Sequence, residues 1–143
     1  MTRVDFYVLT NKNSQQERFH FACRLVEKAV KQGNRVLIAT DDEQSSENIN
    51  TLLWSFSPES FVPHAIVGSE AAQTAPVVIS HDTDDEAHHD VMVNLGLGLP
   101  EYFSRFKRVS EIVVQEQSVL EATRKNYSWY QQRGYPLNTH KLS

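Results

Sequence analysis

The chain has 143 residues, of which 22% are charged and 40% are hydrophobic, and its formal net charge at pH 7 is -4. This length suits one domain with a substantial core, and the hydrophobic content excludes a disordered chain. The acidic balance argues against a surface that coats duplex nucleic acid, which is normally strongly basic, so no strong direct binding to nucleic acid is expected.

The first half of the chain predicts two strand–helix units. Residues 4–9 (VDFYVL) are rich in aromatic and β-branched side chains, which is typical of a strand. A serine–glutamate capping box at residues 14–17 precedes apolar residues that recur at helical spacing until Gly33. Residues 35–40 (RVLIAT) predict a buried parallel strand, and a second helix follows to about Phe56.

The second half predicts four short strands and two helices. The strands cover residues 65–67, 76–80, 91–95 and 109–114, a short helix covers 101–106, and a longer helix runs from 118 to 133, before Gly134. This alternation predicts an α/β fold with a mostly parallel central sheet flanked by helices. The chain has neither repeats nor a linker, so residues 1–143 are expected to form a single domain.

The loop after the first strand bears on nucleotide binding, because ligands of α/β sheets favour the carboxyl ends of parallel strands. Its sequence, TNKNSQQE, contains no glycine. Dinucleotide fingerprints and P-loops need glycine for the close approach of phosphate to the backbone. The sequence therefore predicts a Rossmann-like fold without a phosphate-binding loop, and no cofactor is expected.

Acidic and histidine residues offer two candidate metal sites. Asp41, Asp42 and Glu43 follow the second strand, where they either hold magnesium or cap the next helix at the positive end of its dipole. The segment HDTDDEAHHD, residues 81–90, carries groups that can ligate zinc. Because Ala87 is its one apolar residue, this segment is interpreted as a solvated, mobile loop.

Catalytic chemistry has little support in the sequence. Cys23 lies on the apolar stripe of the first helix, where burial keeps a thiol inert. As the only cysteine, it also excludes an intrachain disulfide and a cysteine-based zinc site. We expect no catalytic residue, no metal site and no enzymatic activity. The alternative is a metal-dependent hydrolase that uses Asp41, Asp42 and the loop around His88 and His89.

The N-terminal sequence MTRVDFYVL lacks the basic and then apolar arrangement of a secretory signal peptide. No apolar run in the chain approaches the ~18 residues that a membrane span requires. We therefore expect a cytoplasmic protein that does not bind membranes.

Aromatic residues gather at the end of the second predicted helix, in the sequence LLWSFSPESFVPH. One apolar stripe of this helix comprises Ile49, Leu52, Leu53 and Phe56. Trp54 lies off the stripe, about 140° round the helix from Ile49 at ~100° per residue. It either packs on the following loop or forms an exposed anchor beside Phe61, since Trp is enriched at interface hot spots. Two prolines restrict the loop, which lowers the entropy lost on docking.

The last predicted helix has a locally basic face in an acidic protein. Leu120, Arg124 and Tyr127 lie at i, i+4 and i+7 on one face, and Lys125 is one position further round. An arginine beside aromatic and aliphatic side chains can bind a carboxylate while an apolar group is covered. The other interpretation is a solvent-facing Arg124, with Tyr127 and Tyr130 packing inward.

Five segments, in order over nearly the whole chain, carry a family resemblance: VDFYVL, GNRVLIATDDEQ, LLWSFSPESFVPH, APVVI and RKNYSWYQQRGYPLNTH. The most specific parts are the LLW…ESFVPH block and the C-terminal RxxYxxYxxxGYxLN pattern. Together they resemble the chi subunit of bacterial DNA polymerase III. The sequence diverges from the family at residues 68–75 and across residues 81–90, and no family property is transferred there.

The resemblance implies a non-catalytic adaptor in DNA replication. Chi subunits have an α/β fold similar to nucleotide-binding domains but without a working phosphate loop. They bind the psi subunit of the clamp-loader complex, and they bind the acidic C-terminal tail of single-stranded-DNA-binding protein, which tethers the polymerase to coated template. In the family, the positions of Trp54 and Phe61 belong to the psi-facing surface.

The family's tail-binding surface uses basic and tyrosine positions on the last helix, which Arg124 and Tyr127 match. A further lysine of the family, one turn earlier, corresponds to Leu120, so one basic contact is absent. Lys125 is the residue that could replace it from the next position. This departure affects the expected strength of tail binding rather than its existence.

Overall fold

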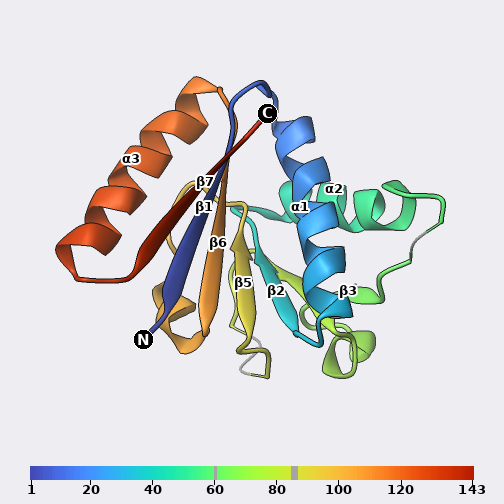
Figure 1. Ribbon diagram of the computed structural model, residues 1–143. Helices are drawn as coiled ribbons and strands as arrows, with labels where there is room; N and C mark the ends of the chain where they lie inside the picture. Colours follow the sequence, from blue (N-terminus) through green and yellow to red (C-terminus); the bar gives the residue numbers. More distant parts are fainter. Residues whose placement is uncertain (60, 85–86) are drawn as a thin grey trace.

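Seven parallel strands form one sheet in the computed structural model, which describes residues 1–59, 61–84 and 87–143 (Figure 1). Their order across the sheet is β3-β4-β2-β5-β6-β1-β7. The elements along the chain are β1 (Arg3–Leu9), α1 (Gln15–Lys31), β2 (Val36–Ala39), α2 (Glu43–Ser55), β3 (His64–Ile66), η1 (Glu70–Gln73), β4 (Val77–Ser80), β5 (Val91–Asn94), η2 (Glu101–Arg105), β6 (Arg108–Val113), α3 (Gln117–Gln132) and β7 (Leu137–Leu142). The predicted α/β fold with a parallel central sheet is confirmed.

The α-helices cover both faces of the sheet. Successive residues of a strand point to opposite faces. In β1, the ring of Phe6 lies 5.1 Å from that of Tyr127 in α3, whereas the ring of Tyr7 lies 5.9 Å from that of Phe21 in α1. Because α2 packs beside α1, these two helices cover one face and α3 covers the other (Figure 1).

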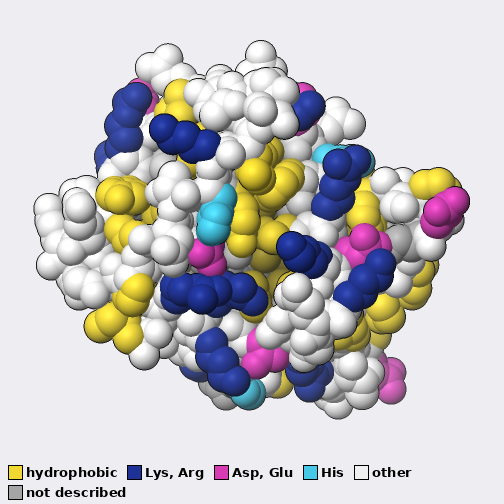
Figure 2. All heavy atoms as spheres, viewed as in Figure 1, with side chains coloured by type: hydrophobic (Ala, Val, Ile, Leu, Met, Phe, Trp, Pro, Cys, Tyr) yellow, Lys and Arg dark blue, Asp and Glu magenta, His cyan; other side chains and the backbone are white. Residues whose placement is uncertain are grey.

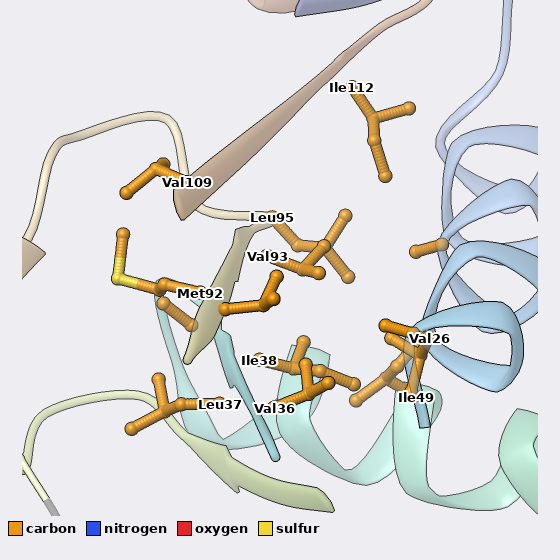
Figure 3. Packing of buried hydrophobic residues seen from close by; sticks show 14 of the residues in the cluster. Val26, Val36, Leu37, Ile38, Ile49, Met92, Val93, Leu95, Val109 and Ile112 are labelled. Atoms are coloured by element: carbon orange, nitrogen blue, oxygen red, sulfur yellow. The ribbon is translucent and has the colours of Figure 1, made fainter. Parts of the chain in front are cut away.

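Burial on both faces explains the apolar central strands. β2, β4 and β5 are buried at every position. In Figure 3, Val36 and Ile38 point toward α1 and α2, while Leu37 points the opposite way. Val26 of α1 and Ile49 of α2 supply the helix side of this core. Each fully buried aliphatic side chain of this kind stabilises the fold by ~1.5–3 kcal/mol.

The sequence analysis does not predict the C-terminal strand β7. Its sequence, LNTHKL, is mostly polar, and all but its first residue are exposed. β7 pairs in parallel with β1 and forms one edge of the sheet. An exposed edge strand buries neither face fully, so it lacks the apolar run that identifies the central strands.

The helices differ in detail from those that the sequence predicts. The short helix expected at residues 101–106 is the 3-10 helix η2, and η1 lies where no helix is expected. The capping box of α1 is confirmed, because Ser14 Oγ accepts a hydrogen bond from the Glu17 backbone N–H at 3.2 Å. Within the described residues, no helix has both the length and the apolar character needed to span a membrane.

A buried polar network joins the sheet to α1 and α3. Glu111 Oε2, in β6, accepts hydrogen bonds from Tyr130 Oη at 2.9 Å and from Asn94 Nδ2 at 3.1 Å. Arg18 of α1 donates to the carbonyl of Ile112 at 2.7 Å. Burial raises the pKa of Glu111 to about 7, although the hydrogen bonds from Asn94 and Tyr130 and the charge of Arg18 oppose the rise.

Replacing Glu111 with glutamine tests this network. The folded-state pKa of about 7 lies above the unfolded value of ~4.3, so between these pH values the folded protein binds more protons than the unfolded chain. The free energy of unfolding of the wild-type protein therefore falls as pH rises through this range. This fall should exceed the fall measured for Glu111→Gln by roughly 3 kcal/mol. Urea unfolding at about pH 4.5 and about pH 8 measures this difference. Parallel pH dependence in the two proteins would show that Glu111 does not titrate in this range.

Candidate functional site

Two aromatic side chains and a histidine form an exposed cluster at the junction of α2 and β3, which we call the aromatic patch. Trp54 is 63% exposed and Phe61 is 57% exposed. Their ring centroids are 5.0 Å apart, and the His64 ring lies 5.2 Å from that of Trp54. The large apolar side chains of Trp54 and Phe61 therefore contact each other but remain largely exposed to solvent.

The helical position of Trp54 explains its exposure. On α2, Ile49 and Leu53 are fully buried, and Leu52 and Phe56 are partly buried against the core. Trp54 projects from the other side of the helix, so the alternative of a tryptophan buried under the following loop is wrong. The sequence analysis misses His64 in this cluster. Its position three residues after Phe61, in the same block, is the available signal.

The described part of α3 presents Arg124 and Tyr127 to solvent. Arg124 is exposed, and Tyr127 is 36% exposed with one side of its ring against Phe6 of β1. Leu120, one turn earlier, is partly buried against the core. Tyr130 is fully buried, so the inward-packing alternative holds for Tyr130 and only in part for Tyr127.

Lys125 lies apart from Arg124 and Tyr127, because adjacent residues of a helix point ~100° apart. It lines a cavity of about 390 Å³ together with Leu99, Phe103 and Trp129. Neither Arg124 nor Tyr127 lines this cavity. The structure therefore groups Arg124 and Tyr127 on one side of α3 and places Lys125 on the next.

The order of the strands separates the aromatic patch from α3. β3, beside the patch, is one edge of the sheet, whereas α3 packs over β6 and β1 near the other edge (Figure 1). Five strand spacings separate β3 from β1, or ~24 Å at ~4.8 Å per spacing. The two sets of residues therefore form separate surfaces.

The acidic residues after β2 have structural roles. Asp42 caps α2, because its Oδ1 accepts a hydrogen bond from the Ser45 backbone N–H at 2.8 Å, and this bond lowers the pKa of Asp42. Asp41 Oδ2 accepts from the Leu97 backbone N–H at 2.9 Å. A Cβ atom at Gly96 would lie 2.6 Å from Asp41 Oδ1, so this contact requires glycine. Of the two interpretations of these acids, helix capping is observed for Asp42, whereas Asp41 binds the loop after β5.

The interpretation of residues 81–90 as a solvated loop is wrong for several of them. His88 is fully buried, and its Nε2 lies 2.9 Å from the carbonyl oxygen of Ala75. Asp90 Oδ2 accepts a hydrogen bond from the Arg35 backbone N–H at 2.8 Å. These polar groups contact backbone atoms of the residues just before β2 and β4. The composition of the segment does not reveal such contacts. The other acids of the segment include residues 85 and 86, which lie outside the described residues.

The alternative hydrolase site is not assembled. Asp41 and Asp42 follow the end of β2, whereas His88 and His89 precede the start of β5, and β2 and β5 run parallel. These residues therefore lie beyond opposite ends of two neighbouring strands, about 23–26 Å apart at ~3.3 Å per residue. In the part of the chain that the structure describes, no group of three or more His, Cys, Asp and Glu side chains could hold a metal ion. Burial raises the pKa of Cys23 to about 12, as expected for an inert thiol.

The fold defines an open α/β protein with a parallel sheet. A solved structure of the same fold is Mss116p DEAD-box helicase domain 2 bound to an RNA duplex, with a TM-score of 0.61 and 10% identity. The match covers 97% of this chain and 64% of that chain. At this identity the likeness concerns the fold alone.

The sequence matches a family model, "DNA polymerase III chi subunit, HolC", over residues 1–138. It is 39% identical to the DNA polymerase III subunit chi of Pseudomonas aeruginosa, over 99% of this chain and 98% of the relative. It is 29% identical to that of Escherichia coli, over 97% of both chains. The chain belongs to the family of DNA polymerase III chi subunits.

Proposed function

We propose that this chi subunit is a non-catalytic adaptor with two protein-binding surfaces. The aromatic patch binds the psi subunit and so joins the protein to the clamp-loader complex. The surface around Arg124 and Tyr127 binds the acidic C-terminal tail of single-stranded-DNA-binding protein. The observation that carries the proposal is the exposed Trp54–Phe61 pair in a chain that belongs to the chi family.

The aromatic patch has the properties of a binding hot spot. Tryptophan is among the residues that contribute most at interfaces, because a large rigid side chain buries much area at little entropic cost. Pro58 and Pro63 flank Phe61 and restrict the backbone that carries it. The ring contacts of Trp54 with Phe61 and His64 hold the patch in place before binding, which lowers the ordering cost of docking.

The α3 surface suits a peptide that ends in a carboxylate beside an apolar group. The Arg124 guanidinium can form a charge-assisted pair with a carboxylate. Tyr127 and the exposed part of Leu120 offer apolar cover on either side of it. Lys125 lies on the neighbouring side of the helix. It adds positive charge near the Arg124–Tyr127 surface but does not contact the carboxylate or the apolar group of the peptide.

Several observations support a role without catalysis, cofactor or metal. Asp41 and Asp42 are engaged in backbone hydrogen bonds, and the Cys23 thiol is buried. The relatives are named as subunits of DNA polymerase III. We place the protein in the cytoplasm with the rest of the replication complex.

Trp54→Ala should weaken psi binding by roughly 2 kcal/mol or more, as truncation of a hot-spot residue does. The free energy of unfolding should fall by about 1 kcal/mol or less, because exposed ring pairs contribute ~0.5–1.5 kcal/mol and core truncations ~3–5 kcal/mol. Titration with psi and thermal unfolding measure the two effects. Tyr127→Ala is the matched control, an exposed aromatic on the other surface that should bind psi normally. A Trp54 variant that melts far earlier than wild type would place this residue in the core.

Arg124→Glu should weaken binding of a fluorescent tail peptide by at least ~2 kcal/mol, because repulsion replaces a charge-assisted pair. Tyr127→Ala should cost less, about 1–2 kcal/mol, since it removes mainly apolar cover. Added salt should weaken wild-type binding only modestly, because few charges take part.

Psi binding is the control for both α3 variants, and it should stay unchanged. Equal tail affinity in Arg124→Glu and wild type would remove Arg124 from the site. Loss of tail binding in a folded Trp54→Ala variant would contradict the model of two separate surfaces.

A further inference from the structure

The face of the sheet that carries α1 has a groove between this helix and the strands β5, β6, β1 and β7. The groove has a volume of about 430 Å³. Its floor includes Tyr7, Val91, Val93 and Ser110, and α1 contributes a wall that includes Phe21 and Leu25. Figure 2 shows this face, with hydrophobic side chains at its centre and Lys and Arg side chains around them. We call this hollow the α1 groove; it lies on the opposite face of the sheet from α3.

Three cations line the α1 groove: Arg24 and Lys28 from α1, and Arg108 from β6. Among the described residues, no carboxylate lies within ion-pair distance of any of the three. The whole chain carries a net charge of -4, so this group of cations is a local excess of positive charge. An anionic ligand is the complement of such a surface.

A buried acceptor lies on the same face. Asp5 is paired with Ser110 in the register of β1 and β6, and it is 3% exposed. Its Oδ1 lies 3.3 Å from His140 Nε2, and its Oδ2 lies 3.5 Å from Arg3 Nε without a hydrogen bond from any described residue. Asp5 does not line the groove, and the Arg3 guanidinium lies beside its buried oxygen, so Asp5 offers no contact to a ligand there.

These features favour a peptide over a nucleic acid. Base stacking needs a free aromatic face, and the Tyr7 ring already has the His140 ring stacked at 5.0 Å on it and Phe21 at 5.9 Å. The partly exposed Phe21 and Leu25 of the α1 wall instead suit an apolar side chain.

We propose that the α1 groove binds a short acidic peptide segment of a partner protein. An apolar side chain of the segment packs against the partly exposed Phe21 and Leu25, and its carboxylates pair with Arg24, Lys28 and Arg108. This surface is distinct from the aromatic patch and from the Arg124–Tyr127 surface. The proposal therefore does not depend on the functions proposed for those two surfaces.

A fluorescent peptide of sequence Asp-Leu-Asp-Phe-Asp-Leu-Asp is the probe, and amide proton–nitrogen correlation spectra of the wild-type protein locate its binding. The amides of Val93, Ser110 and His140 should shift on titration. Shifts confined to α3 around Arg124 and Tyr127 would overturn the proposal, as would no shift at all.

Fluorescence anisotropy then compares two variants with the same change in net charge. The double variant Arg24→Glu/Lys28→Glu should weaken binding of the peptide by about tenfold or more. Lys31→Glu/Lys107→Glu should bind like wild type, because these exposed lysines pair with Glu27 and Asp90 and do not line the groove. Equal weakening in both variants would contradict the assigned contacts.

A thymidine oligonucleotide of about 20 nucleotides is the competitor. We expect it to leave the bound peptide in place. Displacement of the peptide, with the same amides shifting, would identify the α1 groove as a nucleic-acid surface and overturn the peptide assignment.

Discussion

A parallel sheet must be covered on both faces, and this requirement shapes the surface of the molecule. α1 and α2 cover one face and α3 covers the other, while β3 and β7 remain at the edges. Apolar side chains that lie where the helices stop covering the sheet remain exposed to solvent. The aromatic patch lies where α2 ends beside one edge strand, and the α1 groove lies where the cover of α1 stops. The aromatic patch and the α1 groove are therefore places where the helices leave the sheet or its edges uncovered, whereas the Arg124–Tyr127 surface lies on α3 itself.

The polar residues at the strand ends serve the same architecture. In related α/β folds such positions commonly hold ligands. In this chain, Asp41 and Asp42 instead bind backbone N–H groups of the loop after β5 and of the first turn of α2. Near the other ends of the strands, His88 Nε2 lies beside the backbone carbonyl of Ala75, and Asp90 accepts a hydrogen bond from the Arg35 backbone N–H. These polar side chains therefore hold the loops at the strand ends through backbone contacts.

The sequence predicts the central strands and the position of Trp54 off the apolar stripe of α2, because hydrophobic periodicity reflects which side of an element meets the core. It leaves open whether Trp54 is exposed, since periodicity does not describe how the following loop packs. It misses β7, since an exposed edge strand has no such pattern. Glu111 is missed for a different reason. A carboxylate in an apolar strand indicates a buried partner, but the sequence does not identify this partner, which is Tyr130 on α3. His88 shows the same limit, because composition describes a segment and not the carbonyl groups that it meets in the fold.

The central claim is that one rigid domain binds two partners at separate surfaces. Calorimetric titration of psi into protein that is already saturated with the tail peptide tests it most directly. Because the two surfaces lie ~24 Å apart, their binding free energies should add, and the psi affinity should stay within about twofold of its value without peptide. Sedimentation of the mixture should show a single complex that contains all three components. Displacement of the tail peptide by psi would contradict the account.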